Sequence, residues 1–80
     1  MRLQFDQHGN MLVDPRELAT KLGTDAARLR HLKRLGLVSS RIEPGSGKDK
    51  GRSRVTVRTE TAAWEAIFDE AGALILERKL

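Results

Sequence analysis

The sequence has 80 residues, no cysteine and a net charge of +4. This length predicts one domain, 1–80, with a thin core, and the lack of cysteine excludes a disulfide framework and a thiolate zinc site. No apolar run approaches the roughly 20 residues that span a bilayer, and the N-terminus is polar within a few residues. We therefore expect a cytoplasmic protein with no membrane partner.

The charge is unevenly distributed along the chain. Residues 28–58 carry +8, because ten basic side chains are opposed only by Glu43 and Asp49, and the remaining residues carry −4. A basic segment of this kind is typical of proteins that bind polyanions, among which nucleic acid is the commonest.

The first predicted elements are two short strands, 3–5 and 11–13, joined by a turn. Asp6 suits the start of that turn, and Gly9 accepts the positive φ that closes it. The same Phe-Asp-x-x-Gly phrase returns at residues 68–72. We therefore predict two hairpins of similar build, with shared turn chemistry as a simpler explanation than duplication.

Two short helices are predicted next, at residues 15–22 and 25–35. Asp14 suits the N-cap of the first, Pro15 its first position, and Gly23 its end. Thr24 is predicted to cap the second helix, and Gly36 to end it. Leu29, Leu32 and Leu35 recur at a spacing that lines one helix face, which leaves the basic residues on the others.

The second half of the chain reads as strands. Residues 37–43 and 52–59 are predicted to form a long hairpin around the Gly-rich loop 44–51. Its outer face is basic, because Arg54, Thr56 and Arg58 alternate with the inward Val55 and Val57.

Residues 62–68 fit either a helical stripe or a strand face. Composition favours a helix, but the Phe-Asp-x-x-Gly turn that follows favours a strand, which we predict. A last strand is expected at 73–78, with Leu74, Ile75 and Leu76 mostly covered. The fold class is then α+β, a mainly antiparallel sheet with two short helices on one face or at one end. Its core is expected to contain the three aromatic residues: Phe5, Trp64 and Phe68.

The helix pair followed by a basic hairpin resembles a winged helix-turn-helix. Ala19, Gly23 and Leu29 match the small, turn and inward positions of that motif. The resemblance implies that the second helix and the hairpin contact nucleic acid. The implied contact residues are Arg28, Arg30, Arg34, Lys48, Lys50, Arg52 and Arg54.

A second resemblance covers nearly the whole chain. The Gly-x-Gly-x-Asp-x-Gly-Arg run at residues 45–52 and the Phe-Asp-x-x-Gly hairpin at 68–72 are similar to those of a small bacterial family of uncharacterised proteins. That resemblance supports a strand at 62–68 and implies no catalytic residue.

No catalytic or metal-binding pattern emerges from the residues. The Gly45–Lys48 run is not a phosphate loop, because Ile42 stands where its first glycine belongs and Asp49 where Ser or Thr belongs. His8 and His31 lack neighbouring ligands at metal-site spacing, and no serine has a recognisable base. We expect no enzyme activity, no metal and no cofactor.

The sequence thus favours a small nucleic-acid-binding protein that pairs as a homodimer, since a second copy would enlarge a thin core. The alternative is a structural or partner-binding module that self-associates through strand edges and binds no nucleic acid.

Overall fold

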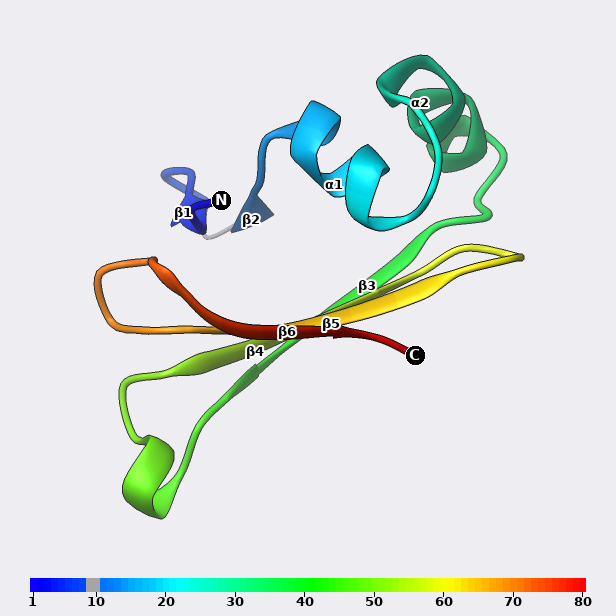
Figure 1. The fold of residues 1–80 in the computed structure, drawn as a ribbon. Coiled ribbons are helices and arrows are strands. Elements are labelled where there is room, and N and C mark those ends of the chain that lie inside the picture. The colour runs from blue at the N-terminus through cyan, green and yellow to red at the C-terminus, as the bar shows by residue number, and fades with distance from the viewer. Residues whose placement is uncertain (9–10) are drawn as a thin grey trace.

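Two short helices lie on one face of a four-stranded antiparallel sheet in the computed structural model, which describes residues 1–8 and 11–80 (Figure 1). The elements are β1 (Gln4–Phe5), β2 (Met11–Leu12), α1 (Pro15–Lys21), α2 (Ala26–Arg34), β3 (Ser39–Pro44), β4 (Ser53–Arg58), β5 (Ala63–Phe68) and β6 (Leu74–Lys79). A 3-10 helix, Gly47–Asp49, forms the tip of the β3–β4 hairpin. The predicted α+β class is confirmed.

The sheet is a simple meander with the order β3-β4-β5-β6, and β1 and β2 form a separate pair. Strand β5 confirms the strand predicted at 62–68. The turn after it, on which that prediction depended, also forms as expected. The Asp69 carboxylate accepts hydrogen bonds from the backbone N–H groups of Ala71 and Ala73, each 2.9 Å long. Gly72 then takes a φ of +84°. In the first hairpin Asp6 accepts from His8 N–H at 2.8 Å, while the predicted Gly9 lies outside the described residues.

The core fills the space between the helices and one face of the sheet. Alternation puts Val55 and Val57 of β4 on that face, opposite Ala66 and Trp64 of β5. Leu18, Ala19 and Leu22 of the first helix region, Leu29 of α2, and Leu3 complete the buried cluster with Phe68. Within the described residues, no helix lies on the other face of the sheet (Figure 1).

Both helices begin at aspartates. Asp14 accepts a hydrogen bond from Arg16 N–H at 2.9 Å, and Asp25 accepts one from Arg28 N–H at 2.8 Å. Thr24 was predicted as the N-cap of the second helix, but the N-cap is Asp25. A carboxylate cap also complements the positive end of the helix.

Three predictions of burial are wrong. Ile75 and Leu76 are 45% and 64% exposed, because β6 bulges beside Ile67 and Phe68 and the outer sheet face is uncovered. Phe5 is 50% exposed, because it lies two residues, or about 7 Å along the strand, beyond Leu3, whose N–H bonds to Gly72. Leu35 is 57% exposed, because it is already the C-cap of α2.

Candidate nucleic-acid interface

The second helix holds its basic side chains outward because its apolar side is anchored in the core. Leu29 and Leu32 are buried, and Ala19 is only 1% exposed, so the two helices approach closely. Gly23, with φ +71°, makes the turn between them, and Gly36, with φ +73°, ends α2. These constraints fix which side of α2 meets solvent.

The exposed surface of α2 follows one helical stripe. Ala27, Arg30, His31 and Arg34 are spaced i, i+3, i+4 and i+7, and all four are exposed. Arg28 and Lys33 flank this stripe and are also exposed. We call these six residues the α2 face.

The cations of the α2 face have no acidic partner among the described residues. Helix α2 contains four Arg or Lys residues and no Asp or Glu. None of the ion pairs within residues 1–8 and 11–80 involves them. Lys33 and Arg34 complement the negative C-terminal end of the helix, but Arg28 and Arg30 lie too far from it for that role.

The hairpin residues are partly neutralised. Arg52 pairs with Asp49 at 3.3 Å, and Arg54 pairs with Glu43 at 3.6 Å. Lys48 lies in the 3-10 helix and Lys50 is its C-cap; both are exposed and form no ion pair in the described part of the chain. The hairpin tip thus offers two unpaired cations.

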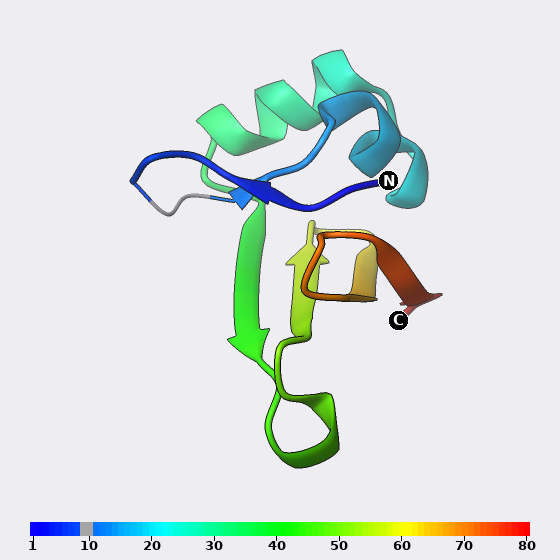
Figure 2. The same ribbon diagram turned by 90° about the vertical axis from the view of Figure 1, so that its left-hand side faces the viewer.

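The α2 face and the hairpin tip do not form one surface. Figures 1 and 2 place α2 and the tip at opposite ends of the molecule, with the length of β3 and β4 between them. The resemblance to a winged helix-turn-helix implied that the second helix and the hairpin both contact nucleic acid, which requires one shared surface. The strands instead run away from the helices, so the tip lies at the far end.

Sequence reasoning named the basic outer face of the hairpin but left two of its arginines out of the site. Arg41 and Arg58 lie on the outer face of β3 and β4, beside a hollow of about 430 Å³ that also borders Arg54 and Glu65. Strand alternation was the signal that could have included them. Arg41 pairs with Glu43 at 3.6 Å, whereas Arg58 has no ion pair in residues 1–8 and 11–80.

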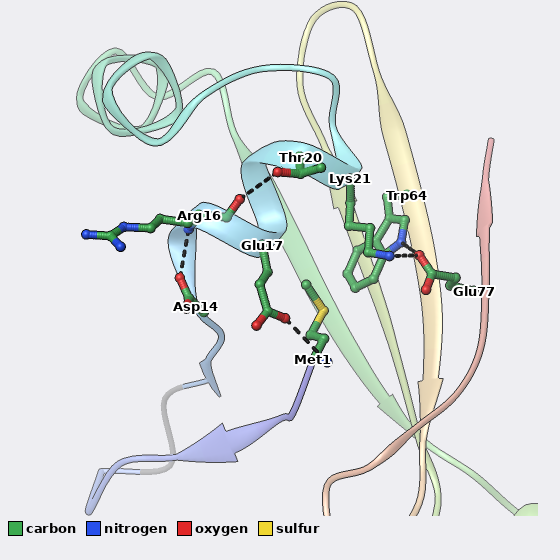
Figure 3. Close-up of polar contacts among 8 residues, drawn as sticks. All are labelled: Met1, Asp14, Arg16, Glu17, Thr20, Lys21, Trp64 and Glu77. Atoms are coloured by element: carbon green, nitrogen blue, oxygen red, sulfur yellow. Dashed lines mark hydrogen bonds and ion pairs between the residues drawn. The ribbon is translucent and has the colours of Figure 1, made fainter.

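A polar cluster ties the helix layer to the sheet (Figure 3). Lys21 Nζ of α1 lies 2.7 Å from Glu77 Oε1 of β6, and Trp64 Nε1 donates to the same oxygen at 3.1 Å. The contact with Lys21 and then that with Trp64 lower the pKa of Glu77 below its ordinary value. This cluster joins α1 to β6 and to the buried Trp64 of β5.

Comparison with known proteins gives a family. A family model matches residues 1–80. The chain belongs to DUF6522, a family of unknown function. No curated protein and no solved structure matches the chain. The expected membership of a small uncharacterised family is therefore confirmed, and the likeness of this DUF6522 chain to a winged helix-turn-helix stays a prediction.

Within residues 1–8 and 11–80, no three His, Cys, Asp or Glu side chains come together as metal ligands. Neither helix in the same part of the chain is long and apolar enough to cross a membrane.

Proposed function

We propose that the protein binds the phosphate backbone of nucleic acid through the α2 face, as a binding protein with no catalytic role. The observation that carries this proposal is the set of four exposed cations on one short helix, none of which has an acidic partner in the described residues. Unpaired Arg and Lys side chains on a rigid element suit phosphate oxygens, because binding then costs no broken ion pair.

The rigidity of α2 supports the proposal. Its N-cap, its terminal glycine and the buried Leu29 and Leu32 hold the helix in one orientation. Cations on a fixed element lose less conformational freedom on binding than cations on a loop. Lys48 and Lys50 belong to the hairpin tip at the opposite end of the molecule, so they are not part of the contact proposed for α2.

Three charge-matched double variants test which surface binds. Arg30→Ala with Arg34→Ala alters the α2 face, Lys48→Ala with Lys50→Ala alters the hairpin tip, and Arg41→Ala with Arg58→Ala alters the outer sheet face. Each removes two positive charges. Affinity for a fluorescent DNA duplex is measured at about 50 mM salt.

We expect the α2 variant to lose about tenfold or more in affinity and the sheet-face variant to lose least, because only direct phosphate contacts release counterions. A hairpin variant that abolishes binding while the α2 variant binds like the unaltered protein would overturn the assignment to α2. Equal small losses in all three would indicate non-specific attraction by net charge.

A further inference from the structure

Strand β6 is a free edge of the sheet. It is the last strand of the order β3-β4-β5-β6, and the isolated bridge between Arg2 and Ala73 touches only the turn before it. Along Leu76 to Lys79 no other described segment pairs with its outer side. An edge strand with unpaired backbone groups is a template for another strand.

One hydrogen bond shows which backbone groups of β6 point toward β5 and which point away from it. Leu80 N–H donates to the carbonyl of Ala63 at 2.9 Å, so Leu80 faces β5. Since alternate residues of an antiparallel strand bond to the same neighbour, Arg78 and Leu76 also face β5. The N–H and C=O groups of Glu77 and Lys79 therefore point outward, away from the sheet.

The side chains along β6 are complementary to those of β6 in a second copy of the chain. Leu76 and Leu80 are exposed on the outer sheet face, and Glu77 and Lys79 lie on the inner one. Both contacts of Glu77 use Oε1, and Lys79 has no ion pair within residues 1–8 and 11–80. One carboxylate oxygen and one ammonium group thus remain for an intermolecular pair.

We infer that a second copy of this chain pairs with β6, antiparallel, about a two-fold axis at Arg78. In this register Glu77 stands opposite Lys79 of the second copy, and Leu76 stands opposite its Leu80. The outward backbone groups of Glu77 and Lys79 complete four hydrogen bonds across the axis. The two sheets become one, and both helix layers lie on the same face of it.

Other pairings are less favourable. An axis at Glu77 opposes two carboxylates, and an axis at Leu76 brings the bulge at Ile75 into the ladder. The proposed axis opposes two Arg78 side chains, but each already pairs with its own Glu65 at 3.1 Å. The other edge strand, β3, ends at Pro44, which has no N–H to donate.

Single cysteines test the register, because the natural chain has none. Only Arg78 faces its own copy across the axis, at a non-hydrogen-bonded pair whose Cα separation suits a disulfide. Under oxidised glutathione we expect Arg78→Cys to form a covalent dimer, and Leu76→Cys and Lys79→Cys to remain largely uncrosslinked. No dimer from Arg78→Cys, or equal crosslinking of all three variants, would overturn the register.

The mass in solution tests the pairing itself, without nucleic acid. Sedimentation equilibrium of the unaltered chain should show a dimer whose association weakens by about tenfold in Lys79→Glu, which places two acids opposite each other. Lys48→Glu makes the same charge change at the hairpin tip and should leave association unchanged. A strict monomer at millimolar concentration, or equal weakening by both substitutions, would contradict the proposal.

Discussion

Glu77 is the residue at which the sheet holds the helix layer. Its lowered pKa comes from Lys21 first and Trp64 second. A carboxyl whose pKa is lower in the folded state adds stability above its unfolded pKa, and that stability is lost as the pH falls through the folded pKa. We therefore expect Glu77→Gln to cost about 1 kcal/mol at pH 7 and less at pH 3, measured by urea unfolding.

The control for this prediction is Glu60→Gln. Glu60 is exposed in the turn after β4 and forms no ion pair in the described part of the chain. Its substitution should change the unfolding free energy by less than about 0.5 kcal/mol at either pH. An equal loss of unfolding free energy in Glu77→Gln at pH 7 and at pH 3 would contradict a stabilising role for the charge of Glu77.

Gly72 and Gly36 separate two costs of replacing a glycine. Both have positive φ, +84° and +73°. A Cβ on Gly36 would meet nothing within 4 Å, whereas one on Gly72 would collide with the Leu3 carbonyl oxygen. We expect Gly36→Ala to cost about 1 kcal/mol and Gly72→Ala distinctly more, since Leu3 must also move. Thermal unfolding of the two variants would check the order, and similar costs would contradict the close approach.

Local chemistry explains which residues the sequence predicted correctly. The turn aspartates and glycines, and the pair Trp64 and Phe68, behave as their types suggest. Ile75 and Leu76 do not, because an apolar run gives no sign that one sheet face lacks a cover. Phe5 differs because its burial depends on where Leu3 meets Gly72, a contact across the whole chain.

At the scale of elements, α2 depends on its docked side. Leu29 is 2% exposed, whereas Leu35, at the end of the same helix, is largely exposed. We expect Leu29→Ala to destabilise the protein by about 2–5 kcal/mol and Leu35→Ala by less than about 0.5 kcal/mol. Chemical unfolding followed by circular dichroism measures both. Equal costs would mean that α2 is not seated as described.

The elements themselves were predictable because their signals are local. Caps and terminal glycines bound both helices, and alternation marks β4. The choice of strand for β5 depended on the turn after it, since its own residues fit a helix equally well. The bulge in β6 could not be predicted from its own residues, because it is a shift in the pairing register between β5 and β6.

At the scale of the molecule, the candidate site was predicted in its parts but not in its arrangement. Residue types and helical spacing identify Arg28, Arg30 and Arg34 as exposed cations. They do not indicate that the β3–β4 hairpin carries Lys48 and Lys50 to the opposite end, nor that Asp49 and Glu43 pair with Arg52 and Arg54. Those facts depend on strand direction and side-chain geometry.

The salt dependence of duplex binding tests the central claim most directly. Four phosphate contacts by α2 predict a slope of log affinity against log salt near −3.6, or roughly a hundredfold loss between about 50 and 200 mM. Arg30→Ala with Arg34→Ala should reduce that slope by about half. An unchanged slope in this variant, or no binding at about 50 mM salt, would contradict a phosphate-binding role for the α2 face.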